Sequence, residues 1–305
     1  MHGSGEDHWR SRAGLPAVKG VLASPTTPGI APLPADADTQ DELGAPVRLA
    51  RLSVGAAIAD LVRHVWVPRW RLPDGGVVEQ GVLEYPSANL VIEADAAAIH
   101  GPHIGRSSRR LEGTGWAFGA LLQPGVARLL MHGPMQALVG ESVPLERLRV
   151  TDAAAMTRDV RAACAVENDA GALTAFEAWL AAQHLVLDDG ARRVRHIVEL
   201  AETDRTILRA DDLAAASGLG LRSLQRLVRE QLGLTPKWLI GRYRMQEAAA
   251  ALAAPDPPSL AELAASVGFS DQAHLTRVFR TVIGQTPRRY ALAAQAARAA
   301  RTLGG

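Results

Sequence analysis

Cysteine is nearly absent from this chain, which has 305 residues and a single cysteine, Cys164. One cysteine excludes an intrachain disulfide, which fits a reducing compartment. Cys164 lies in an alanine-rich segment of helical composition, RAACAVE. A cysteine in such a setting usually acts as a small buried hydrophobe, so we expect no catalytic role for it.

The sequence also lacks a long apolar run. No stretch of about 18 uninterrupted apolar residues occurs, the length that indicates a membrane-spanning helix. The first thirty residues carry charges between Glu6 and Lys19 and no compact apolar block, so they do not predict a secretory signal. We therefore expect a cytoplasmic protein with no membrane span.

Motifs for catalysis and cofactor binding are missing as well. The stretch LPDGG lacks the lysine and the helix context of a phosphate-binding loop, and no serine nucleophile elbow occurs. His100 and His103 have no cysteine or third ligand nearby, so a surface turn is favoured over a metal site. We expect no catalytic residue, no metal and no cofactor.

Charge is present but unevenly distributed. Residues 1–190 contain 16 Lys or Arg against 22 Asp or Glu, whereas residues 191–305 contain 17 against 10. In the second part 16 of the 17 basic residues are arginine, whose planar fork matches phosphate oxygens and guanine edges. A basic module attached to an acidic one is typical of a polyanion-binding protein with a separate sensing domain.

Four segments differ in texture, and together they predict an α+β protein. Short apolar runs punctuated by glycine and proline, such as GGVVEQGVLEYP and ANLVIEAD, indicate a mainly β N-terminal domain. The last segment reads as helices joined by short turns. The expected segments are a disordered tail at 1–45, a β-rich sensing or dimerisation domain at 46–150, a helical connector at 151–190 and an all-α domain at 191–305.

Four residues of the β-rich segment are candidates for an apolar ligand pocket: Trp66, Trp70, Glu84 and Trp116. Tryptophans often line such pockets, although packing in a core or an interface is their commoner role. Glu84 is also interpreted more simply as a solvated or salt-bridged carboxylate.

An internal repeat is the strongest feature of the sequence. LAAASGLGLRSLQRLVREQLGLTP begins at Leu213, and LAASVGFSDQAHLTRVFRTVIGQTP begins at Leu263. The offset is 50 residues in the first helix of each copy and 51 after a one-residue insertion. The second-helix matches are Leu224 with Leu275, Arg226 with Arg277, Arg229 with Arg280, Gly233 with Gly284, Thr235 with Thr286, and Pro236 with Pro287.

Each copy predicts a helix-turn-helix unit. A glycine in the turn permits the positive φ that ends the first helix, and Ser270 or Asp271 can cap the second helix of copy two. The second helix of each copy has an apolar inner face and a polar outer face, and such a helix enters the major groove of DNA. Between the copies, residues 237–253 predict one continuous linker helix about 25 Å long. Such a spacer can hold two recognition helices about one DNA turn apart.

These residues resemble those of the AraC-type regulators. The resemblance covers residues 194–293 and rests on the paired units, on RYRMQEAAAALA and on GFSDQAHLTRVFRTVIGQTPRRY. Val228 departs from the pattern, because an aromatic residue is usual there. The β-rich segment is similar to an uncharacterised domain that precedes some AraC-type modules, although this likeness is looser.

The resemblance implies a bacterial transcription regulator, usually an activator that contacts RNA polymerase, with double-stranded DNA as its partner. It leaves a small-molecule effector and a homodimer open. The DNA-facing residues it implies are Arg222, Gln225, Arg226 and Arg229 in the first unit and Ala273, His274, Thr276, Arg277 and Arg280 in the second.

Two alternatives concern the N-terminal segment. It could be an enzyme with an appended DNA-binding domain, which the missing catalytic motifs disfavour. It could also be a protein-interaction module that binds no ligand.

Overall fold

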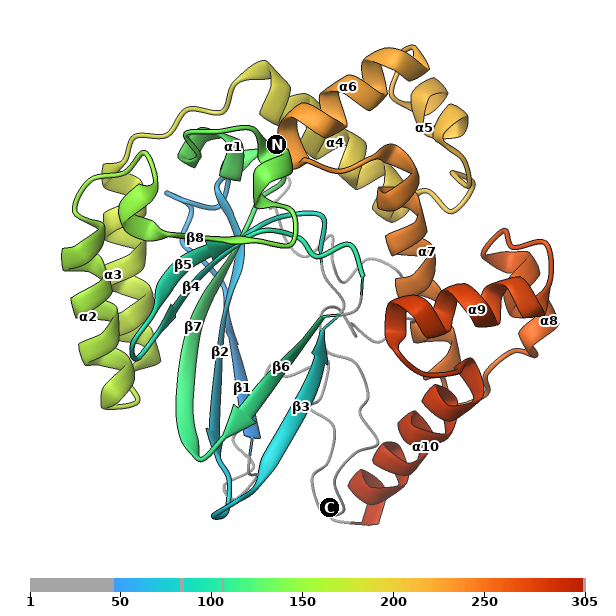
Figure 1. The fold of residues 1–305 in the computed structure, drawn as a ribbon, viewed down its shortest axis with the longest axis horizontal. Helices are drawn as coiled ribbons and strands as arrows, with labels where there is room; N and C mark the ends of the chain where they lie inside the picture. Colours follow the sequence, from blue (N-terminus) through green and yellow to red (C-terminus); the bar gives the residue numbers. More distant parts are fainter. Residues whose placement is uncertain (1–46, 83–84, 106, 304–305) are drawn as a thin grey trace, which may run out of the picture.

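The protein is described from a computed structural model, which places residues 47–82, 85–105 and 107–303 (Figure 1). The expected N-terminal tail and Glu84 lie outside these described residues. A mainly β N-terminal part is followed by helices, which confirms the predicted fold class.

The N-terminal part is built on an antiparallel six-stranded sheet in the order β1-β2-β7-β4-β5-β8, and β3 pairs with β6 in a separate two-stranded ribbon. In the ribbon, β3 follows β2 and β6 precedes β7, so the ribbon is connected to the sheet next to the paired residues Arg71 and Thr114. The strands are β1 (Val47–Leu52), β2 (Val62–Arg71), β3 (Val77–Val82), β4 (Asn89–Glu93), β5 (Ala97–His100), β6 (Ser107–Glu112), β7 (Thr114–Leu122) and β8 (Ser142–Pro144).

Alternation along the strands gives the sheet two different faces. Val65 and Val67 of β2 are buried in the main core, together with Phe118 of β7. Trp66 and Trp70 of β2 point to the opposite face, where their rings lie against glycines of β7. One face of the sheet is thus part of a hydrophobic core and the other presents half-buried aromatic rings.

Two helices cover the core face of this sheet: α2 (Ala153–Ala165) and α3 (Asp169–Ala182) (Figure 1). Phe176 of α3 lies 5.4 Å from Phe118, measured between ring centroids, and both rings are fully buried. The segment expected as a helical connector therefore shares the core of the β domain. The short elements before it are α1 (Val126–Leu130), η1 (Met135–Leu138) and η2 (Leu145–Arg147).

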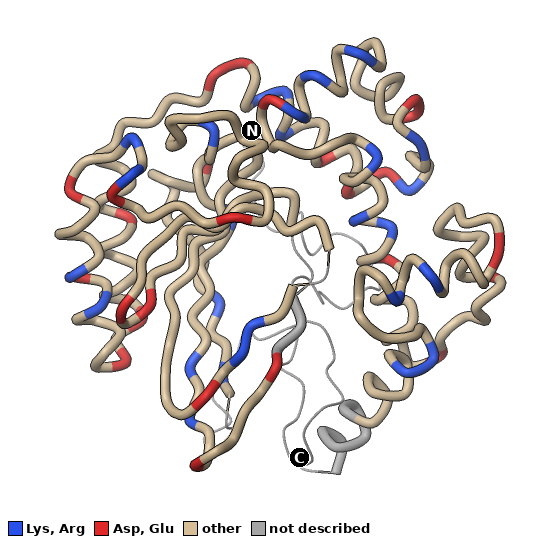
Figure 2. Tube along the Cα trace, viewed as in Figure 1, with Lys and Arg blue, Asp and Glu red and all other residues tan. Residues whose placement is uncertain are grey.

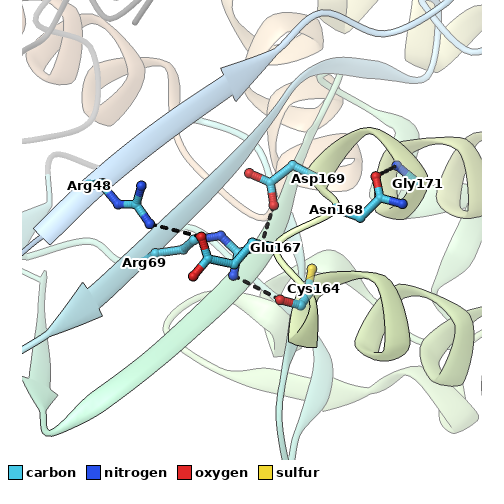
Figure 3. A network of polar contacts seen from close by, with 7 residues as sticks. All are labelled: Arg48, Arg69, Cys164, Glu167, Asn168, Asp169 and Gly171. Atoms are coloured by element: carbon cyan, nitrogen blue, oxygen red, sulfur yellow. Dashed lines mark hydrogen bonds and ion pairs between the residues drawn. The ribbon is translucent and has the colours of Figure 1, made fainter. Parts of the chain in front are cut away.

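Polar contacts tie the turn between α2 and α3 to the edge of the sheet (Figure 3). Arg69 of β2 donates to the backbone carbonyl of Cys164 at 2.9 Å and forms an ion pair with Asp169. Arg48 of β1 pairs with Glu167 at 3.2 Å. The Asn168 side chain caps α3 by accepting from the Gly171 N–H at 2.9 Å. These contacts fix the positions of α2 and α3 relative to β1 and β2.

Cys164 is fully buried in the same core, and burial raises the pKa of its thiol to about 11. Only a thiolate reacts readily with alkylating agents, so the native protein should resist iodoacetamide at pH 7.5. Mass spectrometry should find Cys164 labelled at least about tenfold faster in denaturant than in buffer. Equal rates in both conditions would show that this core is open to solvent.

The C-terminal part consists of helices only, and the sequence repeat is also a repeat of structure. The first copy comprises α5 (Ala210–Ala216), α6 (Leu221–Leu232) and α7 (Pro236–Leu252). The second comprises α8 (Leu260–Ser266), α9 (Gln272–Ile283) and α10 (Pro287–Leu303). Preceding both, α4 (Asp189–Thr203) packs on the first copy.

Equivalent residues end and begin the helices of the two copies. Gly233 and Gly284 end the second helices with φ of 73° and 85°, a left-handed conformation that favours glycine. Thr235 and Thr286 then cap the third helices, since their hydroxyls accept from the backbone N–H three residues later. The linker helix predicted at 237–253 is α7, and α10 is its counterpart.

Each copy has its own hydrophobic core, and α7 belongs to both. Leu239 and Tyr243 of α7 are buried with Leu224 and Val228 in the first core. Further along α7, Met245 is the first of several residues that are buried in the second core. One continuous helix therefore contributes to the cores of both units.

No helix within the described ranges has the length and apolar character needed to cross a bilayer. Among the same residues, no three His, Cys, Asp or Glu side chains gather as ligands for a metal ion.

Candidate DNA-binding surface

The first candidate recognition helix is α6, which begins after Gly220 and ends at Leu232. Its inner face, with Leu224 and Val228, is fully buried against α4, α5 and α7. Val228, which replaces the usual aromatic residue, is thus a core residue. All four residues expected to face DNA on this helix are exposed: Arg222, Gln225, Arg226 and Arg229.

The second candidate recognition helix is α9, and it begins with a side-chain cap that α6 lacks. Asp271 accepts from the His274 N–H at 2.7 Å, which identifies Asp271 as the N-cap. Leu275 and Phe279 are fully buried on the inner face. Of the residues expected to face DNA, Thr276 is half-buried and the other four are exposed: Ala273, His274, Arg277 and Arg280.

The five arginines of the two outer faces are all exposed. None of the five makes a salt bridge or a side-chain hydrogen bond with any described residue: Arg222, Arg226, Arg229, Arg277 and Arg280. By contrast, Arg63 in the N-terminal part is paired with Glu202. The guanidinium donors of both helices are therefore available to an external acceptor, and Figure 2 shows Lys and Arg positions in blue along the C-terminal helices.

Two further basic side chains lie at equivalent positions of the two copies, and they are not among the residues expected from the sequence to face DNA. Lys237 follows Pro236 at the start of α7, and Arg288 follows Pro287 at the start of α10, and both are exposed. The signal for them was present in the repeat, since the two positions are 51 residues apart. Helix N-termini and basic side chains both favour phosphate groups nearby.

The helix-turn-helix part is joined to the β domain by a buried ion pair. Arg63 of β2 donates to both carboxylate oxygens of Glu202 in α4, at 2.9 and 3.0 Å. The guanidinium of Arg63 lies 4.9 Å from the centroid of the Tyr85 ring, and Tyr85 and Tyr243 of α7 are both buried. Burial alone would lower the pKa of Arg63, but its interactions with Tyr85, Glu202 and Tyr243 raise it above the ordinary value. Arg63 therefore remains charged at neutral pH.

A second contact between the two parts involves the turn after β5. Arg242 of α7 is 3% exposed and donates to the carbonyls of His103 and Ile104 at 3.1 and 3.2 Å. Trp238 donates its indole N–H to the Ile104 carbonyl at 3.2 Å, and its ring lies 4.7 Å from the Arg242 guanidinium. The first half of α7, which belongs to the first unit, is thus held to the β domain by these contacts.

The three tryptophans expected to line a pocket do not share one face of the sheet. Trp66 stacks on Gly119 and donates to Asn89 at 3.1 Å, and Trp70 stacks on Gly115. Trp116 instead packs against the main core, because neighbouring residues of a strand point to opposite faces. The structure brings Trp66 and Trp70 to one face and separates Trp116 from them.

The two histidines of the HGPH segment differ in burial. His100 ends β5 and is half-buried, and burial together with the nearby Arg109 lowers its pKa to about 4. His103 is exposed in the following turn. His100 is therefore neutral at pH 7.

Two family models match the chain. Residues 213–293, which include both helical units, match a model described as "Helix-turn-helix domain". Residues 53–144, which include strands β2 to β8, match a model described as "Domain of unknown function (DUF6597)".

Similar characterised proteins are transcription activators, matched over part of their length. The chain is 32% identical over 131 residues to the transcriptional activator NphR of a Rhodococcus species, covering 42% of this chain and 38% of that protein. It is 35% identical over 78 residues to the activator RhaS of Klebsiella pneumoniae, covering 26% and 28%. The chain thus spans about a third of the length of these relatives.

Among solved structures, an AraC-type DNA-binding domain protein from Chromobacterium violaceum is 26% identical, with a TM-score of 0.32 over 34% of this chain and 92% of that one. ToxT from Vibrio cholerae is 11% identical, with a TM-score of 0.37 over 81% and 97%.

The paired units, their open arginine faces and the family matches define a helix-turn-helix DNA-binding protein. More particularly, its C-terminal part contains an AraC-type helix-turn-helix domain, preceded by a DUF6597 domain, and the characterised proteins it resembles are transcription activators.

Proposed function

We propose that this protein is a cytoplasmic transcription activator that inserts α6 and α9 into successive major grooves on one side of double-stranded DNA. The observation that carries the proposal is the duplicated unit with two exposed, unpaired arginine faces joined by the single helix α7. A helix of 17 residues spans about 25 Å, which suits recognition helices one DNA turn apart.

In this proposal the outer faces divide into base-reading and phosphate-binding residues. Arg226 and Arg277 pair with guanine, and Gln225 pairs with adenine, because these side chains match the edges of those bases. Arg222, Arg229, His274 and Thr276 complete the groove contacts, and Ala273 contributes an apolar contact. Arg280 lies nearer the phosphates, together with Lys237 and Arg288 at the starts of α7 and α10.

The remaining parts of the proposal concern partners and the division of the chain. The AraC-type relatives named as activators favour contact with RNA polymerase during activation. The main core, whose buried residues run from Ile58 to Leu180, favours a single effector-sensing or dimerisation domain that includes α2 and α3. Residues 191–305 then form the DNA-binding domain, and the effector is a small molecule.

Genome-wide mapping of binding sites, followed by titration of an enriched duplex, tests this proposal. The mapped sites should share a discrete motif, and the affinity should fall about a thousandfold between 50 and 200 mM salt if about six phosphates are contacted. Binding without any shared motif would contradict sequence-specific recognition and would indicate non-specific binding to polyanions.

A further inference from the structure

The ring of His274 is oriented by two neighbours at the start of the second recognition helix, Ser270 and Phe269. Its Nδ1 lies 3.3 Å from the Ser270 hydroxyl oxygen. Phe269 meets the ring edge to face, with centroids 5.0 Å apart. Arg244 of the linker helix lies over the other ring, 4.3 Å from the Phe269 centroid. An exposed histidine is thus held in one orientation by residues of the turn.

The Ser270 hydroxyl has a single proton to donate. It donates it in a hydrogen bond to the Asp271 carboxylate, which is a stronger acceptor than imidazole. Ser270 donates to Oδ2 of Asp271 at 3.1 Å, while Oδ1 of Asp271 accepts from the His274 N–H. Hydrogen bonds from the His274 backbone and from Ser270 lower the pKa of Asp271, so its carboxylate is ionised at neutral pH. A charged carboxylate forms the stronger hydrogen bond, so the hydroxyl proton goes to Asp271.

The Ser270 oxygen can then only accept from the histidine ring. A neutral imidazole has one N–H and one lone pair, and the hydrogen bond at one nitrogen determines which nitrogen carries the proton. The proton of the neutral His274 ring is therefore on Nδ1, and Nε2 is an acceptor. No described residue makes a hydrogen bond with Nε2, and the side chain is exposed in the first turn of α9, where recognition helices contact base edges.

We propose that Ser270 makes His274 a hydrogen-bond acceptor, so that α9 selects adenine or cytosine at one base position. In the major groove only adenine N6 and cytosine N4 offer amino donors, whereas guanine and thymine present acceptors that Nε2 cannot pair with. The same lone pair excludes a phosphate contact, because phosphate oxygens also only accept. This inference rests on the proposed insertion of α9 into DNA, but the tautomer itself does not.

The first test uses the free full-length protein, so it is independent of DNA binding. NMR correlation of the imidazole nitrogens with the ring protons, above the pH at which the ring protonates, should show the proton of His274 on Nδ1. Ser270→Ala should shift the proton toward Nε2, and Ser270→Thr, which keeps the hydroxyl, should restore the wild-type pattern. A proton on Nε2 in the wild-type protein would overturn the inference even if DNA binding is strong.

The second test selects binding sites from randomised duplexes with the wild type and the same variants. His274→Ala identifies the base position that His274 contacts, because the preference at that position alone should disappear. There the wild type should favour adenine or cytosine about fivefold over guanine or thymine. Ser270→Ala should reduce this preference, and Ser270→Thr should retain it.

The outcomes separate this inference from the proposed function. A wild-type preference for guanine or thymine at that position, or one that Ser270→Ala leaves unchanged, contradicts the role of Ser270. Failure of the wild type to select any sequence contradicts the proposed function instead, while the NMR result still decides the tautomer.

Discussion

Replacing Arg63 with methionine is expected to lower the free energy of unfolding by about 3–5 kcal/mol, because it leaves the Glu202 carboxylate buried without its partner. The side chains of Arg63 and Glu202 are only 10% and 8% exposed. Around them, burial raises the pKa values of Tyr85 and Tyr243, so both hydroxyls remain protonated and neutral, and no positive charge takes the place of the guanidinium. Chemical denaturation at pH 7 measures the loss.

A matched control and a double variant separate the ion pair from simple truncation. Arg192 pairs with Asp189 at the protein surface, and Arg192→Met should leave the denaturation midpoint close to that of the wild type. Combining Arg63→Met with Glu202→Leu should recover part of the stability lost in Arg63→Met, because no buried charge is left unpaired. If Arg63→Met and Arg192→Met behave alike, the contact between the two parts is solvated.

Removing either of the equivalent arginines, Arg226 or Arg277, is expected to weaken binding to the specific DNA site by about 1–3 kcal/mol. Each loses a fork that pairs with guanine, and base preference should relax at one position in the corresponding half of the site. Arg226 and Arg277 lie in separate helices with separate cores, so the losses should be nearly additive in the double variant. Titration of labelled duplexes, with single base changes in each half, measures both effects.

Arg158 offers a control for the change in charge. It is exposed on α2, in the β domain, so Arg158→Ala removes the same charge without touching either recognition helix. Its affinity for the site should match that of the wild type. Equal weakening of all duplexes by Arg226→Ala or Arg277→Ala would indicate phosphate contacts, and unchanged affinity would show that the base-reading assignment is wrong.

Much of the helical part was predictable because its signals are local. Glycine at the helix ends, threonine-proline at the next helix start and the spacing of leucine and phenylalanine all act within a few residues. Gly233 and Gly284 end their helices as the repeat predicts, and the single helix between the units lies where expected. The repeat also supplied an internal check, since each copy was evidence for the other.

The N-terminal part was less predictable because its contacts join residues far apart in the chain. The strand texture was clear, but the pairing of β2 with β7 and the packing of α3 on the sheet depend on no local motif. For this reason Trp116 was grouped with Trp66 and Trp70, although its strand turns it to the other face.

By itself, the sequence determined that this protein has two helix-turn-helix units with arginine-bearing outer faces, because helix periodicity and capping are properties of short segments. Only the tertiary structure decided that those arginine side chains are exposed, that Arg63 and Glu202 join the two parts, and that Ser270 orients His274. The physical reason is that a hydrogen bond or an ion pair depends on which groups meet in space. Residues 63 and 202 are 139 positions apart, and no local pattern relates them.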